Sequence, residues 1–561
     1  MTLDGATLAM LLRSLPDLTE INLAGVDLDD ADVATFVENG HRLVQVSLGL
    51  AETRQGHRFG SPRLTGGIIG TLDSATSLRR LSLRGIPITD AEVVASEIWD
   101  RLAKADLSET RISDAGALRL AASPTLGELK IEATAVGDDA ATALLDKRWL
   151  ALGLSWTRVS QVALAAARYP QDLRQVDLAG LQVDDNLAEL LGRATSLKAI
   201  DLSYTSVSDK VARVLGTLPQ LRRSALSHSS VGADGIEQLL RAPIVELKAN
   251  GLRTGAATRF AMARSASLQR VTLSTDADWH GLEAIRAEVT LRAISPASGG
   301  PPARLIELQL DDQLTKEFAA QLQVLPSLRS LSVPRIDADV AFDAGFKHLQ
   351  DLRADAAGLT DEMVASLIML PSVVALYISN NDVGPALRGP FSPMLHTLEL
   401  RNTVVDDIAI ESISRLPRLH CIDVPNTEVS ADGVAILARN AINLQSLALD
   451  GSQLSKASVS ALAQCKRLLE LYLYGPGISN ASIAAIASIH LRELQLVDSA
   501  IDDEAVPYLA AIPGLRRLSL SGEITKEGIS ALRALRPYLD IRPGQQTTGA
   551  SAGRAFRSKP I

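Results

Sequence analysis

A sequence period of about 24 residues dominates this chain, from near its first residues to near its last. The stretch from Leu197 to Gln220, LKAIDLSYTSVSDKVARVLGTLPQ, is one full copy, and the next copy begins at Leu221. Other copies begin at leucines of equivalent phase: Leu78, Leu102, Leu126, Leu173, Leu268, Leu328, Leu395, Leu419, Leu444, Leu468, Leu491 and Leu515. A fixed period of this length is typical of solenoids, in which stacked repeats share one continuous core.

Each copy contains a short strand pattern followed by a short helix pattern. Ile200 and Leu202 alternate with polar residues, as in a strand with one buried face. Apolar residues at spacings of three and four run from Val211 to Leu218, as on one face of a helix, and Pro219 ends that pattern. One copy alone cannot bury both apolar faces, so neighbouring copies must pack against one another.

Two polar positions recur between the strand and the helix of each copy. Thr205 lies where the chain turns inward, and we expect its hydroxyl to bond the backbone of neighbouring coils. Asp209 lies at the start of the helix pattern, where we expect its carboxylate to cap the first turn of that helix. Aspartate recurs at this phase: Asp90, Asp114, Asp138, Asp185, Asp361, Asp407 and Asp503. We therefore interpret the frequent Asp-Asp pairs as helix caps and not as catalytic carboxylates.

The copies resemble the 23–24-residue leucine-rich repeats that are common in bacterial proteins. LSETRISDAG (Leu107 to Gly116) and LRNTVVDD (Leu400 to Asp407) are also similar to repeats of F-box leucine-rich adaptors, with Thr or Ser replacing Cys or Asn. No F-box-like segment precedes the first copy, near Leu18. The resemblance covers residues 16–542 and implies an α/β leucine-rich repeat solenoid. We expect a horseshoe of about 22 repeats, with parallel strands on the concave face and short helices on the convex face.

Irregular stretches interrupt the repeats and suggest domain boundaries. The polar stretch AETRQGHRFGSP lengthens the spacing between two copies, so we expect a loop at the rim there. After a short helix expected around Trp279 to Ala287, the stretch SPASGGPPA has no apolar period, and its prolines and glycines prevent a helix. The predicted segments are an N-terminal cap (1–17), an N-terminal repeat arc (18–294) with a rim loop (51–62), an irregular break (295–304), a C-terminal repeat arc (305–542) and a disordered tail (543–561). A continuous solenoid with a surface loop at 295–304 is the alternative.

Composition limits the classes of partner and compartment. The net charge of −9 argues against nucleic acid or a membrane surface as the partner. The two cysteines, Cys421 and Cys465, form no disulfide framework, which favours a reducing compartment, and Cys465 has the phase of a core residue. We see no signal-peptide pattern and no long apolar run, so we expect a cytoplasmic protein, or one secreted without a cleavable signal peptide. Abundant Ala and Arg are typical of a GC-rich bacterial genome.

No motif in the sequence points to catalysis, a cofactor or a metal. The histidines form no HExxH motif, although His396 and His420 have nearly equivalent phases in adjacent coils. Phosphate-binding loops, dinucleotide fingerprints and GxSxG motifs are missing from the sequence. Arg and Lys pairs such as Arg222 and Arg223 follow the helices, and we interpret them as cations at helix C-termini and not as a nucleic-acid stripe. The sequence therefore predicts a protein without enzymatic activity, cofactor or metal.

The C-terminal copies differ from the N-terminal copies on the predicted concave face. In the N-terminal copies the concave positions are small or singly polar, as at Ser82, Asp201 and Ala225. In the C-terminal copies they become Tyr377, Glu399, Arg401, Asp423, Asp450, Tyr472 and Tyr474. Only 3% of the chain is aromatic, and Tyr and Arg dominate many binding interfaces, so we predict that these residues bind a protein. Chance placement of strand-favouring aromatic residues is the alternative.

These observations favour a monomeric, non-catalytic scaffold or adaptor that binds a protein partner on its concave face. A secreted bacterial effector and an ordinary cytoplasmic protein both fit this description. The similarity to F-box adaptors implies an alternative, the substrate-recognition component of a ubiquitin-ligase-type assembly. An enzyme whose site is built across several coils is a third hypothesis, since sequence alone would not reveal such a site.

Overall fold

The computed structural model describes residues 5–26, 28–52, 58–59, 63–252, 254–521, 523–536 and 539–543. These residues form two compact units. Unit 1 contains the described residues of Met1–Thr275 and His280–Glu288, and unit 2 contains those of Asp276–Trp279 and Val289–Arg557. The chain therefore passes from one unit to the other within residues 275–289.

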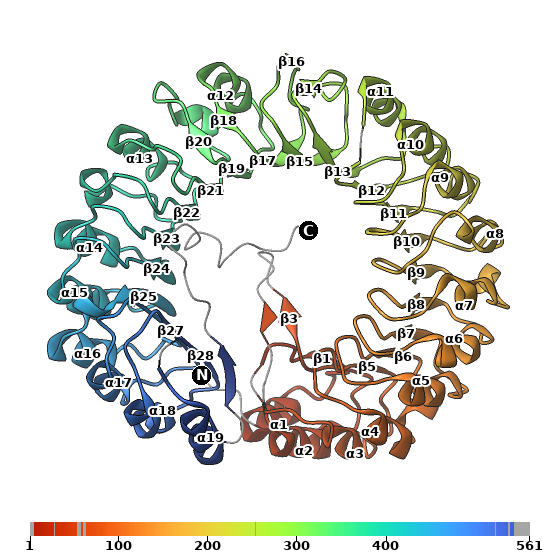
Figure 1. Cartoon of the computed structure of the whole chain (residues 1–561), viewed down its shortest axis with the longest axis horizontal. Helices are drawn as coiled ribbons and strands as arrows, with labels where there is room; N and C mark the ends of the chain where they lie inside the picture. The colour runs from red at the N-terminus through yellow and green to blue at the C-terminus, as the bar shows by residue number, and fades with distance from the viewer. Residues whose placement is uncertain are drawn as a thin grey trace. The chain divides into compact units, whose positions relative to one another are not determined.

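Both units are built from short parallel strands that alternate with helices or turns, and within each unit the strands line one side and the helices the other (Figure 1). The main strands of unit 1 are β1 (Glu20–Asn22), β2 (Gln45–Ser47), β5 (Arg80–Ser82), β6 (Lys104–Asp106), β7 (Glu128–Lys130), β8 (Ala151–Gly153), β9 (Gln175–Asp177), β10 (Ala199–Asp201), β11 (Arg223–Ala225), β12 (Glu246–Ala249) and β13 (Arg270–Thr275). Those of unit 2 are β15 (Glu288–Ala293, from Val289 on), β17 (Leu305–Leu310), β19 (Ser330–Ser332), β21 (Asp351–Arg353), β22 (Ala375–Tyr377), β23 (Thr397–Glu399), β24 (Cys421–Asp423), β25 (Ser446–Asp450), β26 (Glu470–Tyr474), β27 (Glu493–Val497), β28 (Arg517–Leu520) and β29 (Asp540–Pro543).

The helices of each unit follow their strands in the same alternation. In unit 1 they are α1 (Gly5–Ser14), α2 (Asp30–Asn39), α3 (Ile68–Leu72), α4 (Asp90–Ala95), η1 (Ile98–Asp100), α5 (Asp114–Ala121), α6 (Asp138–Leu145), α7 (Gln161–Ala165), η2 (Pro170–Asp172), α8 (Leu187–Gly192), α9 (Asp209–Leu215), α10 (Ala233–Leu239) and α11 (Ala256–Arg264). In unit 2 they are α12 (Lys316–Gln323), η3 (Ala344–Phe346), α13 (Asp361–Leu367), η4 (Pro385–Arg388), α14 (Asp407–Ser414), α15 (Ala431–Asn440), η5 (Gly451–Gln453), α16 (Lys456–Leu462), α17 (Asn480–Ile486), η6 (Asp503–Ala505), α18 (Val506–Ala511) and α19 (Lys526–Leu535).

Strand register places residues of equal phase side by side. In unit 1, Asp201 of β10 is opposite Asp177 of β9 and Ala225 of β11, and the same one-to-one pairing continues along the unit. Leu202 is fully buried, whereas Asp201 beside it is half-buried. The chain is a leucine-rich repeat solenoid. The predicted fold class, with parallel strands and short helices in repeating coils, is confirmed.

The recurring threonines after the strands make a different hydrogen bond from the one that we predicted. Thr205 Oγ1 donates to the carbonyl of Leu202 in its own coil, at 2.6 Å, and not to a neighbouring coil. The same bond, three residues back, is made by Thr110, Thr134, Thr157, Thr403 and Thr427. The hydroxyl bonds a carbonyl of the same turn, so these threonines stabilise each turn locally.

The recurring aspartates at the helix starts also differ from the prediction. Their carboxylates join adjacent coils, whereas we expected them to cap their own helices. Asp209 is the first residue of α9 and not its N-cap, which is Ser208. Its Oδ1 accepts from the backbone N–H of Gly232, the N-cap of α10 in the next coil, at 2.6 Å. Equivalent bonds run from Ser113, Gly137, Ser160, Ser208, Gly384, Ser430 and Thr525 to the aspartate one coil earlier.

The Asp-Asp pairs combine both roles. Asp406 caps α14 by accepting from Ala409 N at 2.9 Å, while Asp407 accepts from Ser430 N in the next coil. In this pair the first carboxylate stabilises its own helix and the second joins adjacent coils, whereas in the Asp138–Asp139 pair the first makes the bridge, to Ser160. Their structural role, as opposed to a catalytic one, agrees with the interpretation from sequence.

Residues 276–304 contain no helix, so the helix expected around Trp279 to Ala287 was wrong. Residues 280–284 form turns where the helix was expected. The two-residue strand β14 (Asp278–Trp279) pairs with β16 (Ser298–Gly299). Trp279 is fully buried, donates from Nε1 to the carbonyl of Ile294 at 2.8 Å and meets the ring of Phe318 edge-on. Here turns and a short strand pair, with the large indole of Trp279 buried, take the place that a helix has in other coils.

Other predicted segments are only partly covered. At the predicted rim loop, β3 (Ala51–Glu52) pairs antiparallel with β4 (Arg58–Phe59), and the remaining positions of 53–62 lie outside the described residues. The predicted tail lies outside them after Pro543. In the predicted cap, the first helix begins at Gly5, whose N–H donates to Asp32 of α2. The predicted domain boundaries stay predictions.

Candidate functional site

Two columns of side chains leave the strands of unit 2 on the face opposite the helices. Leu398 and Leu400 are fully buried, so the alternating residues Glu399 and Arg401 lie on the other face of the strand. Strand register defines the first column: Arg353, Tyr377, Glu399, Asp423, Ala448 and Tyr472. The second column lies two residues further along each strand and contains Asp355, Ser379, Arg401, Pro425, Asp450 and Tyr474. All seven residues predicted for binding lie in these columns, which we call the inner surface of unit 2.

Arg401 is the centre of a charged and aromatic cluster on this surface. Its guanidinium forms an ion pair with Asp423 Oδ2 at 3.0 Å, and the two side chains are only 10% and 12% exposed. The same guanidinium lies 4.0 Å from the centre of the Tyr474 ring, three coils further along the chain. Because a cation is attracted to the face of an aromatic ring, these contacts hold Arg401 in one position.

The other two tyrosines also have intramolecular partners. The guanidinium of Arg353 lies 4.3 Å from the ring centre of Tyr377, and Tyr377 is buried. The hydroxyl of Tyr472 donates to Glu470 Oε2 at 3.2 Å, and the Tyr472 side chain is half-buried. The three tyrosines therefore form a pre-arranged polar surface together with arginines and carboxylates, and do not project freely into solvent.

Burial changes the ionisation of several groups on the inner surface. Burial, reinforced by the nearby charge of Asp423, raises the pKa of Glu399 to about 8. Burial raises the pKa of Asp355 and of Asp423 too, although Arg353 and Arg401 respectively oppose these shifts. Burial also raises the pKa of Tyr474 to about 12. The raised pKa favours the protonated form of Glu399, which can donate a hydrogen bond.

Asp450 has a role that sequence did not suggest. Its Oδ1 accepts from the Ser452 backbone N–H at 2.8 Å and caps η5, while Oδ2 accepts from the Asn426 backbone N–H at 2.8 Å. Arg353, Asp355 and Glu470 belong to the same surface but were not singled out from sequence. They share the phase of selected residues or adjoin them, so a complete list of concave positions would have found them.

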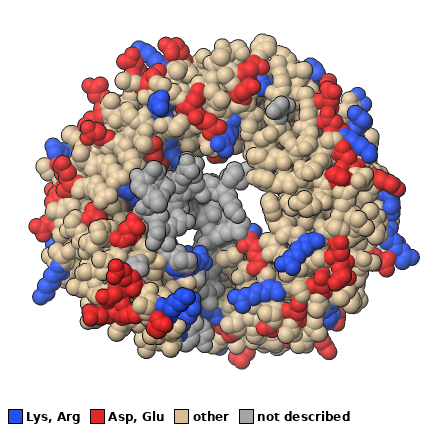
Figure 2. Space-filling view, in the orientation of Figure 1, with Lys and Arg blue, Asp and Glu red and all other residues tan. Residues whose placement is uncertain are grey.

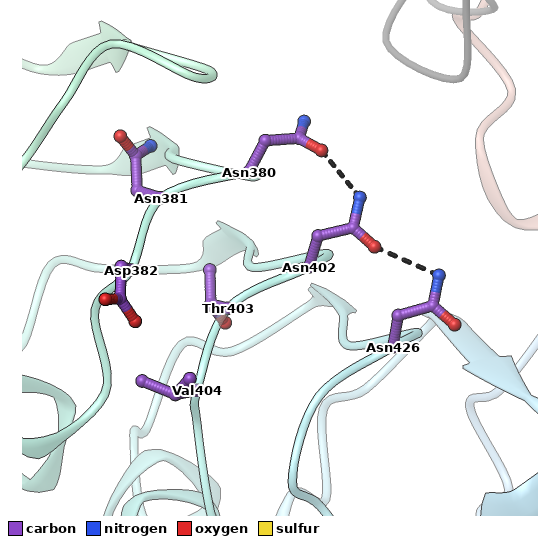
Figure 3. A pocket seen from close by; sticks show the side chains of 7 residues that line it. All are labelled: Asn380, Asn381, Asp382, Asn402, Thr403, Val404 and Asn426. Atoms are coloured by element: carbon purple, nitrogen blue, oxygen red, sulfur yellow. Dashed lines mark hydrogen bonds between the residues drawn. The ribbon is translucent and has the colours of Figure 1, made fainter. Parts of the chain in front are cut away.

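A ladder of asparagines runs beside the inner surface (Figure 3). Asn402 Nδ2 donates to Asn380 Oδ1 at 2.6 Å, and Asn426 Nδ2 donates to Asn402 Oδ1 at 3.0 Å. All three residues are exposed and have left-handed backbones, with φ of 61°, 53° and 53°. With Asn381, Asp382, Thr403 and Val404 they line an open depression of about 490 Å³. Sequence reasoning missed this ladder, although Asn recurs at one phase in three successive coils.

Histidine and cysteine side chains show little sign of reactivity. The rings of His396 and His420 are neighbours, with centres 5.8 Å apart and planes nearly perpendicular, and burial beside His420 lowers the pKa of His396. Within the described ranges, no group of three or more His, Cys, Asp or Glu is placed to hold a metal ion. Burial raises the pKa of the half-buried Cys465 thiol to about 11, and this thiol contacts the Ala438 carbonyl at 2.9 Å. The pKa of Cys421 is raised by burial as well.

The basic residues that follow the helices are paired locally. Arg222 Nη1 donates to the carbonyls of Leu221 and Pro243, while Lys104 pairs with Glu128 on the next strand at 3.0 Å. On the face shown in Figure 2, Lys and Arg are interspersed with Asp and Glu. These contacts favour a structural role for the predicted basic positions. In the part of the chain that the structure describes, no helix is long and apolar enough to cross a membrane.

Similarity between this chain and known proteins is found among solved structures. No protein-family model matches the chain, and no curated protein matches it significantly. Among solved structures, TLR13 in complex with ssRNA13 aligns at 16% identity and a TM-score of 0.41, covering 95% of this chain and 82% of that one. The plant peptide hormone receptor RGFR1 in complex with RGF2 aligns at 15% identity and a TM-score of 0.31, covering 96% and 80%. The description of the fold therefore rests on the strand register and repeat of this chain.

Proposed function

We propose that this chain is a non-catalytic binding scaffold whose inner surface of unit 2 holds a protein partner. The observation that carries this proposal is the cluster of Arg401, Asp423 and Tyr474, fixed by mutual contacts beside an exposed amide ladder. Tyr and Arg contribute much of the binding energy in protein interfaces, and side chains already held in place lose little entropy on binding.

The shape and chemistry of the region suit a polypeptide better than a small molecule. The depression beside the asparagine ladder is open, whereas small ligands usually occupy enclosed, mostly apolar pockets. The exposed amides of Asn380, Asn402 and Asn426 can donate to and accept from peptide groups. The partner would be recognised by backbone hydrogen bonds at the ladder and by side-chain contacts at the arginine–tyrosine cluster.

The proposal extends to the oligomeric state, the source and the compartment of the protein. We infer a monomeric protein of bacterial origin that acts in a cytoplasm, either that of its own cell or that of a host if the protein is a secreted effector. The acidic composition and the two unpaired cysteines support this setting. Sedimentation equilibrium of the full chain tests the monomeric state, and a dimer at micromolar concentration would contradict it.

The decisive experiment is affinity purification of the full chain with mass spectrometry, followed by titration of the purified partner. Replacing Tyr472 and Tyr474 together by Ala should weaken binding by about 2 kcal/mol or more, roughly thirtyfold, because two aromatic contacts and the support of Arg401 are lost. The matched control replaces Arg222 and Arg223 of unit 1 by Ala and should leave the affinity nearly unchanged. Circular dichroism confirms folding, and a folded Tyr variant that binds like wild type would contradict the proposal.

A further inference from the structure

Three bulky residues of unit 1 have the left-handed backbone conformation that L-residues usually avoid. Trp156, Tyr204 and His228 have φ of 58°, 58° and 56° at equivalent positions after β8, β10 and β11. Their side chains are exposed, those of Trp156 and Tyr204 by 56% and 40%. Left-handed backbone is unfavourable for a bulky side chain, and in other coils the same position carries Ala, Glu, Asn or Asp.

The three rings form one continuous surface, which we call the aromatic strip of unit 1. The ring centres of Tyr204 and His228 are 4.7 Å apart in a stacked arrangement, and those of Trp156 and Tyr204 are 5.6 Å apart and tilted. Glycine makes room for the rings in the coils between and beyond them. A Cβ atom on Gly180 would lie 2.4 Å from the Trp156 ring, and one on Gly251 would lie 2.5 Å from the His228 ring.

Carboxylates accompany the aromatic strip on the adjacent strands. Asp177 and Asp201 precede Gly180 and Tyr204 by three residues and are direct neighbours in the strand register. Burial is the main cause that raises the pKa of Asp201, the charge of Asp177 adds to it, and Lys248 opposes it. A further cation would lower the cost of two neighbouring carboxylates, and the faces of aromatic rings three residues further along each copy also attract cations.

We propose that the aromatic strip of unit 1 binds an extended peptide segment rich in arginine or lysine, with its cationic groups over the rings and towards Asp177 and Asp201. The site is separate from the inner surface of unit 2 and does not depend on the proposal made for that surface. Single-stranded nucleic acid also stacks on aromatic rings, but its phosphates would meet two carboxylates here. Charge complementarity therefore favours a basic peptide.

Tryptophan fluorescence offers a direct probe of this site. Of the four tryptophans in the chain, Trp99, Trp149 and Trp279 are buried, so acrylamide quenches mainly Trp156. The probe is a peptide of about ten residues with alternating Arg and Gly, long enough to span the strip when extended. We expect it to reduce the quenching constant by about half at saturation, and we expect no change with the matching Glu-Gly peptide. Unchanged quenching at millimolar Arg-Gly peptide, or tighter binding of oligothymidine, would overturn the proposal.

Two variants test the assigned groups while Trp156 remains as the reporter. Tyr204→Ala should weaken the peptide about fivefold or more, because one cation–π surface is lost. It should fold, since Ala133 already occupies the same left-handed position in another coil. Replacing Asp177 and Asp201 together by Asn should weaken binding and reduce its dependence on salt.

Two control variants change residues outside the aromatic strip, one in unit 1 and one in unit 2. Val162→Ala removes a residue of α7 that is 83% exposed and should leave peptide affinity unchanged. The variant with Tyr472 and Tyr474 replaced by Ala should bind the peptide as wild type does. If Tyr204→Ala and the double Asn variant bind the peptide as tightly as Val162→Ala, the proposal is wrong, whatever partner the inner surface of unit 2 proves to hold.

Discussion

A left-handed position after the strand recurs in both units, and each unit has a run of coils that fills it with its own residue type. In unit 2 it carries Asn380, Asn402 and Asn426, which adopt this backbone readily and hydrogen-bond to one another. In unit 1 it carries Trp156 and Tyr204, for which the same backbone is strained, and their rings are exposed. The asparagine ladder is therefore explained largely by stability, whereas the aromatic strip gains little from its position and suggests a ligand.

The concave positions of the strands also differ between the units, and here the aromatic and charged cluster lies in unit 2. Unit 2 carries Glu399 and Tyr472 in its first column and Arg401 and Tyr474 in its second, while the corresponding positions of unit 1 are Asp177, Asp201 and Ala225 in the first and Ala179, Ser203 and Ser227 in the second. The same repeating backbone thus supports two different surfaces, because only the alternate, outward-facing residues are free to vary. The coils of both units share the pattern of buried residues, and the units differ in their outward-facing residues.

The largest expected effect tests whether both units depend on the same frame. Leu202→Asp in unit 1 and Leu400→Asp in unit 2 each place a charge at a fully buried position, and we expect each to cost several kcal/mol of unfolding free energy. Urea denaturation measures this. As the control, Asp201→Ala should change stability by about 1 kcal/mol or less, because Asp201 is half-buried and loses its hydrogen bond from the Ser203 N–H. If Asp201→Ala destabilised as much as Leu202→Asp, the assignment of core and surface faces would be wrong.

The bridges between coils should differ in strength according to the residue at the next N-cap, because a serine there adds a hydroxyl donor that a glycine lacks. Asp407 in unit 2 accepts from both the N–H and the hydroxyl of Ser430, at 2.8 and 2.6 Å, whereas its counterpart Asp209 accepts from Gly232 N–H. We expect Asp407→Ala to cost about 2–3 kcal/mol and Asp209→Ala about 1–2, since charge-assisted bonds are lost.

Thermal melting measures both variants, and Asp432→Ala is the control. Asp432 is also in the first turn of a helix and exposed, without a bridging bond recorded in the described structure. Its replacement should cost about 0.5 kcal/mol. An effect of Asp407→Ala no larger than that of Asp432→Ala would show that the bridges contribute nothing.

The inner surface of unit 2 should make stability depend on pH. The pKa of Glu399 is raised to about 8, so the folded state holds a proton that the unfolded state releases near its ordinary pKa. The stabilisation is complete below the unfolded pKa of Glu and is lost as pH rises towards 8. Glu399→Gln should therefore gain about 1–3 kcal/mol relative to wild type between pH 5 and pH 8.

The measurement is the urea midpoint at both pH values. Asp201→Asn in unit 1 provides the comparison, because the pKa of Asp201 is also raised by burial and by Asp177. Its gain should have the same sign. A relative loss for Glu399→Gln at pH 8 would mean that Glu399 is ionised and stabilised by the neighbouring arginines.

The smallest expected effect isolates the contact between a glycine and an aromatic ring. Gly180 and Gly358 both have left-handed backbones, with φ of 71° and 78°. A Cβ atom on Gly180 would collide with Trp156, whereas one on Gly358 would have no neighbour closer than 3.9 Å. Gly180→Ala should therefore cost about 1 kcal/mol more than Gly358→Ala, which loses only the backbone preference. Equal melting temperatures would show that the Trp156 ring moves aside freely.

Much of this protein follows from the period of its sequence. A fixed spacing between copies makes residues of equal phase neighbours, so the buried Leu202, the columns that hold Tyr377 and Tyr472, and the contact of His396 with His420 were all predictable. The helix expected around Trp279 to Ala287 failed because its apolar spacing came from residues that are buried by turns and a short strand.

The tertiary structure alone decided which groups meet across coils beyond the adjacent residues of equal phase. The lateral offset of the coils places Asp209 against the next helix start, and the length of the Arg401 side chain lets it reach the Tyr474 ring three coils away. Sequence specified the burial pattern, because hydrophobic spacing acts within one repeat. The partners of polar side chains depend on backbone conformation and on distances between repeats, as at the left-handed Trp156 and Tyr204, and these exist only once the coils have stacked.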